Sequence, residues 1–164
     1  MSDNNFWAHF HLMVNDVPVI GFFFATIFLI LSLTSRARDS WARASVLIII
    51  VSVLGMSLAF FSGDPALNVI DGQPRTSGAA LTQHHIRGLV AVGLALITIV
   101  IAIIASIKAR KAGGIYSRNL LIIVLISSVL STGALAWTGE AGGRINHYEL
   151  QEPADRESEP AHPH

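Results

Sequence analysis

Four long stretches of mostly apolar residues dominate the chain, and short polar segments separate them. They predict helical spans at about 12–34, 43–62, 84–108 and 118–138. A helix needs about 20 apolar residues to cross roughly 30 Å of hydrocarbon, and the four runs are close to that length. From Pro18 to Leu33, and through the cores of the other runs, no Lys, Arg, Asp or Glu occurs apart from Arg87 near one end. A soluble bundle would show a polar face on each helix. We therefore expect an all-α protein, a four-transmembrane-helix bundle in up-down-up-down order.

The distribution of charge predicts the orientation of the spans. Charged residues make up 13% of the 164 residues, about half of the roughly 25% usual in soluble domains. Seven of the eleven basic residues lie in the two turns 35–43 and 108–118, whereas ten of the eleven acids lie elsewhere. The positive-inside rule then places both turns in the cytoplasm and both termini outside, as in a multi-pass protein of the bacterial inner membrane. The N-terminal residues carry no Lys or Arg, so we expect the first span to remain in the mature protein.

Outside the spans, the chain has one long internal loop and a polar tail. The loop, 62–83, contains the turn signals Gly63-Asp64-Pro65 and Asp71-Gly72-Gln73-Pro74. Residues 151–164 are acidic and rich in proline, which predicts a disordered tail after a membrane domain at 1–150.

Histidines gather at the predicted outer end of the bundle. On the topology above, all seven lie on that side, and five come from three separate parts of the chain: His9, His11, His84, His85 and His147. Along a helix from His84, the residues on the same face are the small Gly88, Ala91 and Ala95. Such a groove could admit a flat macrocycle beneath an axial imidazole, or it could be a seam for close helix packing.

Further polar residues accompany these histidines. Arg87 lies on nearly the same face as His84 and could pair with a haem propionate, or it could anchor the span at the headgroups. Asn15 lies one turn after His11, with Pro18 following, and could orient a ligand or be an ordinary interfacial residue. The glycines between Thr138 and His147 predict a tight reversal that would fold His147 over the mouth of the bundle, although a plain exit loop is the alternative.

Three motifs resemble a known family. They are His-Leu-x-x-Asn-x-x-Pro-x-x-Gly from His11 to Gly21, Ser-Gly-Asp-Pro-Ala followed by a His at the start of the third span, and Thr-Gly-x-x-Gly-Gly-x-Ile-x-His-x-Glu from Thr138 to Glu149. The chain in this respect is similar to small bacterial four-helix membrane proteins of a domain-of-unknown-function family, some of which are suspected to bind haem b. It departs from the family pattern at Asp16, where a His is common, and at His85, where an acid is common.

These observations leave three functions open. The first is a b-type cytochrome-like protein with one or two haems b, held by His11 and His84, with His147 as a substitute or part of a second site. It would exchange electrons with a quinol or a periplasmic or membrane redox partner, as a subunit of a larger complex. The second is a copper or zinc site formed by His9, His11, His84, His85 and Asp16, with His147 as a further ligand. The third is a cofactor-free structural subunit, and a homo-oligomer is compatible with each.

Other chemistry lacks support in the sequence. The absence of cysteine excludes thiolate clusters and covalently attached haem of the Cys-x-x-Cys-His type. The chain has no phosphate-binding glycine loop, no Gly-x-Ser-x-Gly elbow and no His-Glu-x-x-His helix. The few basic residues are explained by topology, so we expect no nucleic-acid partner. Electron transfer is therefore a better expectation than stand-alone enzymatic catalysis.

Overall fold

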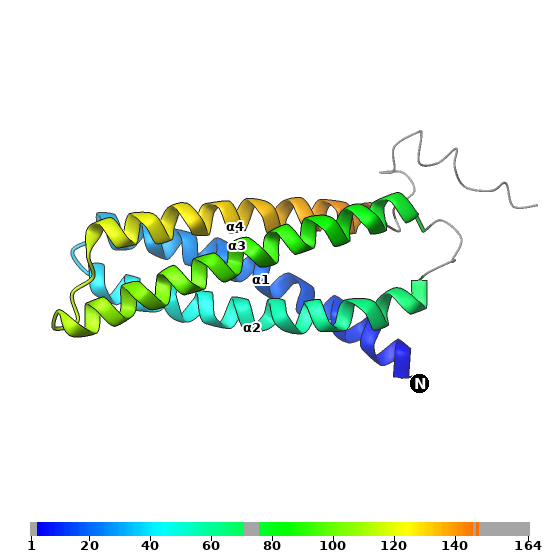
Figure 1. The fold of residues 1–164 in the computed structure, drawn as a ribbon, viewed down its shortest axis with the longest axis horizontal. Helices are drawn as coiled ribbons and strands as arrows, with labels where there is room; N and C mark the ends of the chain where they lie inside the picture. The colour runs from blue at the N-terminus through cyan, green and yellow to red at the C-terminus, as the bar shows by residue number, and fades with distance from the viewer. Residues whose placement is uncertain (1–2, 71–75, 146, 148–164) are drawn as a thin grey trace, which may run out of the picture.

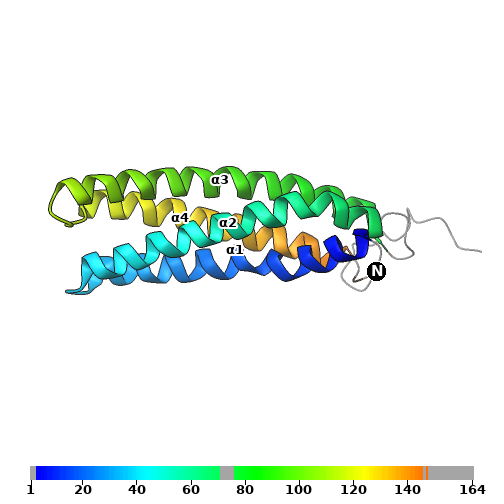
Figure 2. The same cartoon turned by 90° about the horizontal axis from the view of Figure 1, so that it is seen from below.

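Four helices form the whole of the described structure. In the computed structural model, which describes residues 3–70, 76–145 and 147, they are α1 (Asp3–Thr34), α2 (Arg38–Ile70), α3 (Gly78–Lys111) and α4 (Arg118–Arg144). They lie side by side along one long axis, and each runs opposite to the one before it in the chain (Figures 1 and 2). The α1–α2 and α3–α4 turns lie at one end, which we call the turn end. The start of α1 lies at the other, which we call the histidine end (Figure 1). The all-α four-helix bundle is thus confirmed.

The outer surface of the bundle is apolar along each helix. Large side chains such as Leu47, Phe61, Leu89 and Ile126 are exposed, whereas the interior is built mainly from Ala and Ser. All four helices are long and apolar enough to cross a membrane. This inverted arrangement, with large apolar groups outside, is expected when the solvent is lipid. The fold is therefore that of a multi-pass membrane protein with four candidate spans.

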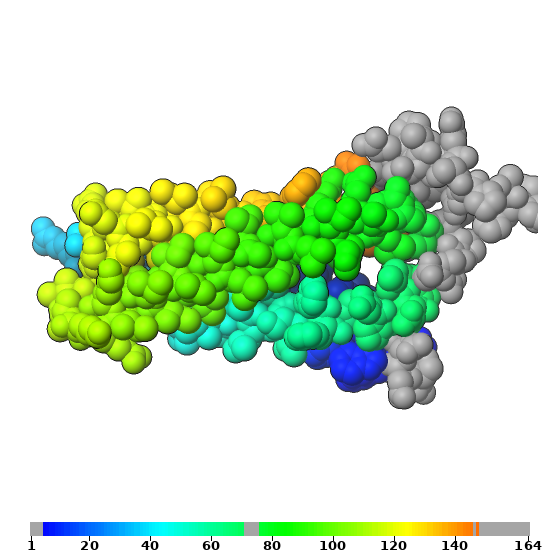
Figure 3. Space-filling model, viewed as in Figure 1, coloured from blue at the N-terminus to red at the C-terminus, as the bar shows by residue number. Residues whose placement is uncertain are grey.

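Helix contacts divide the bundle into two hairpins. α1 packs mainly on α2 and α3 mainly on α4. Of the other neighbouring pairs, α1 and α4 contact each other more than α2 and α3 do. Glycine permits close approach in the first hairpin, because a Cβ atom added at Gly21 would overlap Ser52 and one added at Gly55 would lie 2.5 Å from Val17 Cγ1. Between α2 and α3 the surface shows a gap near the histidine end (Figure 3). The two hairpins are thus joined chiefly through α1 and α4.

Hydroxyl groups link helices inside the bundle. Thr26 Oγ1 lies 2.8 Å from Ser128 Oγ and so joins α1 to α4. Thr98 Oγ1 lies 3.0 Å from Ser131 Oγ and joins α3 to α4. Thr26, Thr98 and Ser131 also donate to carbonyls of their own helices, so these hydroxyl groups are satisfied without water. These hydrogen bonds add directional contacts between helices to an interior of small residues, which have few other polar groups.

The ends of α2 and α3 differ from the sequence prediction. Gly63-Asp64-Pro65 was expected to form a turn, but α2 continues through it to Ile70. Pro65 removes one amide donor and crowds a carbonyl, yet the φ near −65° that its ring imposes is helical. The next helix begins at Gly78, well before the expected 84, and its Ser77 cap accepts a hydrogen bond from the Ala80 N–H at 3.1 Å. The second predicted turn, 71–74, lies outside the described residues.

The glycine-rich segment after Trp137 is also helical. α4 continues to Arg144, so the tight reversal predicted there is wrong. Within the described residues, the glycines with positive φ are Gly113 (68°) and Gly114 (90°), both in the α3–α4 turn. In α4, Gly142 instead leaves room for the side chain of His84. The predicted tail, 151–164, and the domain boundary before it lie outside the described residues.

Candidate functional site

His11 is held between α1 and α2 near the histidine end. Its Nδ1 atom lies 2.9 Å from the carbonyl oxygen of Ala59 and 3.1 Å from Ser62 Oγ. Ser62 Oγ donates to the Leu58 carbonyl at 2.8 Å, so its oxygen is available as an acceptor. The imidazole is half-buried. One residue of the first helix is thus anchored on the backbone of the second.

His84 is held between α3 and α4 in the same way. Its Nδ1 atom lies 3.0 Å from the carbonyl oxygen of Thr138. Gly142, one turn further along α4, makes room for the ring, because a Cβ atom there would lie 3.0 Å from His84 Nδ1. Gly63 stands in the corresponding place in α2, four residues after Ala59, and a Cβ atom there would lie 3.6 Å from His11 Cε1. Each hairpin therefore carries a histidine, a carbonyl acceptor and a glycine one turn beyond it.

The two anchors fix the tautomer of both imidazoles. A carbonyl oxygen only accepts hydrogen bonds, so Nδ1 must carry the proton in each ring. In the neutral imidazole the Nε2 atom then has a free lone pair. Both histidines lie near the first residues of their helices, and α1 and α3 both begin at the histidine end (Figure 1). Two half-buried histidines, one from each hairpin, thus offer an Nε2 acceptor at the same end of the bundle.

Most of the other predicted ligands are exposed, unlike this pair. His9, His85 and Asp16 are exposed, and His147 is exposed just beyond the end of α4. Asn15 is half-buried in α1, one turn after His11. In the described ranges, no three His, Cys, Asp or Glu side chains are grouped so that they could hold a metal ion. Within the described ranges, His11 and His84 are thus distinguished from His9 and His85 by their burial and by their bonds to carbonyls of a neighbouring helix.

Arg87 takes part in a polar network across α3 and α4. Its Nη1 atom donates to Glu140 Oε2 at 2.5 Å and to the Trp137 carbonyl at 3.1 Å. Nη2 donates to Gln83 Oε1 at 2.8 Å, and the guanidinium lies 4.5 Å from the centre of the Trp137 ring. Glu140 also pairs with Arg144. A propionate bound to Arg87 would have to compete with these contacts.

The small residues below His84 face α4. A Cβ atom at Gly88 would lie 3.8 Å from Thr138 Cγ2, and further along the same face Thr98 bonds to Ser131. Ala91 and Ala95, between them, are completely buried or nearly so. Of the two interpretations of this groove, the structure corresponds to the helix-packing seam. A haem macrocycle would therefore need space outside this seam. The gap between α2 and α3 lies near the histidine end (Figure 3).

Sequence reasoning missed the groups that orient the histidines. The acceptors at Ala59 and Thr138 are main-chain carbonyls, which every residue has, so no residue type reveals them. Gly142 was noted, but as a residue for a turn. Its spacing of four from Thr138 on a continuous helix is the signal that could have placed it beside His84.

The fold and this pair define a class, a four-helix membrane protein with one anchored histidine in each hairpin. Compared with models of known families, with curated proteins and with solved structures, the chain shows no significant match. A function for this chain can therefore be inferred only from its own residues.

Proposed function

We propose that this chain is a b-type cytochrome-like membrane protein in which His11 and His84 are the two axial ligands of a haem. The observation that carries the proposal is the matched anchoring of both Nδ1 atoms on carbonyls, at 2.9 and 3.0 Å. A histidine that binds iron or another metal usually donates its second ring N–H to such a group, which sets the tautomer and the ring orientation. Two histidines prepared in this way, at the same end of the bundle, match the number of protein ligands that a six-coordinate haem requires.

Each residue has a distinct part in the proposed site. Nε2 of His11 and Nε2 of His84 would hold the iron, which when bound supplies one-electron chemistry. The carbonyls of Ala59 and Thr138 keep the rings in place and raise their basicity as ligands. Because the ligands come from α1 and α3, which belong to different hairpins, the proposed site would lie between the hairpins rather than within one of them.

The position of the pair limits what the protein would do. Both histidines lie at the histidine end, so electrons would enter and leave on that side of the membrane. The charge distribution predicts this side to be periplasmic, with a quinol or a periplasmic redox protein as the partner. A chain with ligands at one end would not by itself carry electrons to the other, and we propose that it serves as a subunit of a larger redox complex. The resemblance noted in the sequence also favours haem b.

The proposal is tested by purifying the protein in mild detergent after expression with ample haem supply. We expect oxidised and dithionite-reduced spectra of a six-coordinate b haem, confirmed by a pyridine haemochrome assay. His11→Ala and His84→Ala should each remove one axial ligand and lose most of the bound haem. His9→Ala and His85→Ala are matched controls, because these histidines are close in sequence but exposed, and they should retain it.

Two results would contradict the proposal. A six-coordinate spectrum in both His11→Ala and His84→Ala would show that other residues bind the iron. A colourless protein would exclude the haem, and elemental analysis would then separate a copper or zinc protein from a cofactor-free structural subunit.

A further inference from the structure

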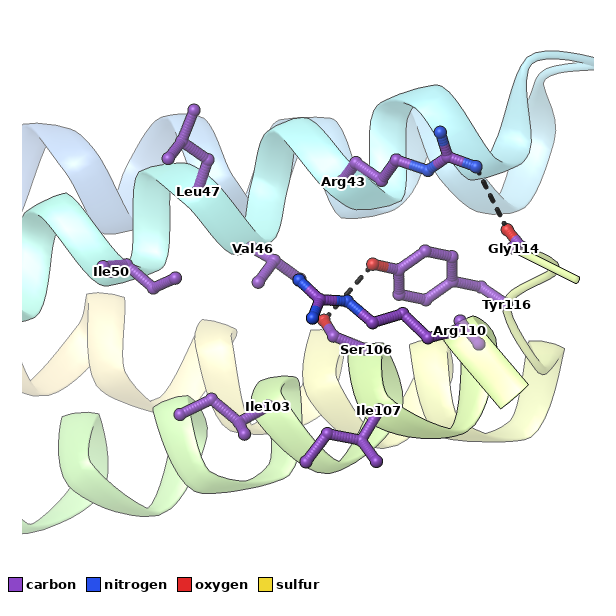
Figure 4. Close-up of a pocket in the computed structure, with 11 residues that line it drawn as sticks. Arg43, Val46, Leu47, Ile50, Ile103, Ser106, Ile107, Arg110, Gly114 and Tyr116 are labelled. Atoms are coloured by element: carbon purple, nitrogen blue, oxygen red, sulfur yellow. Dashed lines mark hydrogen bonds between the residues drawn. The ribbon is translucent and has the colours of Figure 1, made fainter. Parts of the chain in front are cut away.

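A second site lies at the turn end, away from both histidines. There α2, α3 and the α3–α4 turn surround a pocket of about 680 Å³ (Figure 4). Its walls are apolar and come from both helices, with Val46, Leu47 and Ile50 on α2 and Ile103 and Ile107 on α3. α2 and α3 are the neighbouring helices that contact each other least, which leaves this space between them.

The walls of the pocket continue onto the lipid-facing surface. Leu47 is 62% exposed, and Ile103 and Ile107 are 43% and 49% exposed. In a membrane, side chains with this exposure on a spanning helix contact lipid tails. The pocket is therefore open sideways to the hydrocarbon, and an apolar chain could lie along it without leaving the bilayer.

Two arginines border the pocket where the helices end. Arg43 Nη2 donates to the Gly114 carbonyl at 3.3 Å, and the side chain of Arg110 reaches back from the end of α3 toward the space between the helices (Figure 4). In the described part of the chain, neither forms an ion pair, since both salt bridges involve Glu140 at the histidine end. Asp39, the acid of the nearest turn, accepts the Tyr116 N–H at 2.8 Å. The two positive charges are thus not neutralised by a carboxylate.

Two hydroxyl groups also line the pocket, in the same part of it as the arginines (Figure 4). Tyr116 is buried, and its hydroxyl lies 3.2 Å from Ser106 Oγ (Figure 4). Ser106 donates its own hydrogen to the Ala102 carbonyl at 2.9 Å, so the Tyr116 O–H is the donor between them. The Tyr116 oxygen therefore keeps acceptor capacity toward the pocket. The arginines and hydroxyl groups therefore lie toward the turn end, and the side chains of Leu47, Ile50 and Ile103 lie further inward (Figure 4).

We propose that this pocket binds an anionic phospholipid, with its headgroup phosphate between Arg43 and Arg110 and one acyl chain along Leu47, Ile103 and Ile107. Paired basic residues between membrane helices at the headgroup level are suited to phosphate. A free anion would not contact the apolar walls, so these walls favour a ligand that also carries an acyl chain. A zwitterionic lipid would bring its own cation toward two arginines, so a net negative headgroup is favoured. The inference does not depend on the haem.

The test is native mass spectrometry of the protein in detergent with equal amounts of phosphatidylglycerol and phosphatidylcholine. We expect one phosphatidylglycerol to be retained in preference, with each arginine contributing about a fivefold effect. The double variant Arg43→Gln/Arg110→Gln should lose most of this preference. Lys108→Gln/Arg118→Gln, which removes the same charge from exposed positions of the same end outside the pocket lining, should keep it.

A further variant tests the acyl chain. Ile103→Trp puts a larger ring on the apolar wall, leaves both arginines unchanged and should weaken phosphatidylglycerol binding. Equal retention of the two lipids, or an equal loss in both double variants, would overturn the proposal. Displacement of the lipid by millimolar inorganic phosphate, with Ile103→Trp binding as well as the original chain, would show a site for phosphate alone and would overturn it as well.

Discussion

At the scale of single residues, His11 and His84 are anchored on carbonyls of a neighbouring helix, whereas His9 and His85 are exposed. The sequence placed them at one end of the bundle through topology and helix phase. It could not show the hydrogen bonds to Ala59 and Thr138, because these depend on how closely two helices approach. Burial separates this pair from His9 and His85, which have the same chemistry and adjacent positions. Helix packing therefore determines which of these histidines are anchored and which remain exposed.

Gly142 provides a test of this anchoring. Gly142→Ala would put a Cβ atom 3.0 Å from His84 Nδ1, so the ring or the helix must move and the bond to Thr138 should weaken. If haem binds as proposed, its affinity should fall about 10- to 100-fold, as when an orienting group of a metal ligand is lost. Gly63→Ala is the matched control, since its Cβ atom would lie 3.6 Å from His11 Cε1, an ordinary contact. Haem titration of both variants measures the difference, and equal affinities would contradict the anchoring role.

At the scale of helices, the sequence predicted the number of spans but not their ends. The apolar runs of the sequence coincide with the four helices, because a helix that faces lipid needs apolar side chains along its length. The polar ends contain Gly, Pro and Asp, which are common both in turns and in the last turns of a helix. At 63–65 and 139–143 the helix continues because neighbouring helices still pack there, as at His11 and His84. The helix and turn preferences of single residues do not show how far the neighbouring helices continue to pack.

Close packing within the first hairpin makes a further prediction. Gly55→Ala would bring a Cβ atom within 2.5 Å of Val17 Cγ1, so α1 and α2 must separate. Overpacking of this kind should lower the free energy of unfolding by about 1–3 kcal/mol. Gly93→Ala, on an exposed face of α3 with nothing within 4 Å of the added atom, should change it by less than about 0.5 kcal/mol. Unfolding in mixed micelles with increasing denaturing detergent compares the two, and similar values would show that the contact tolerates separation.

At the scale of the whole molecule, the distribution of charge predicts that the histidine end faces the periplasm. The chain has no cysteine, so single cysteines can report the orientation without background. Thr82→Cys, near the start of α3, and Ala37→Cys, in the α1–α2 turn, are exposed at opposite ends. A membrane-impermeant maleimide should label Thr82→Cys but not Ala37→Cys in spheroplasts, and both after lysis. The reverse pattern would invert the topology and place both proposed sites on the opposite leaflets.

The division into two hairpins has a consequence for the lifetime of the protein. His11 is held by α2 and His84 by α4, so a cofactor shared by their Nε2 atoms would connect halves that the α2–α3 contact joins weakly. By linkage, a ligand present at 100 times its Kd stabilises the folded state by about 2.7 kcal/mol. Chains lacking it would open more often and be degraded first by membrane proteases. The cellular amount of this protein would then follow the supply of its cofactor, without any regulation of its synthesis.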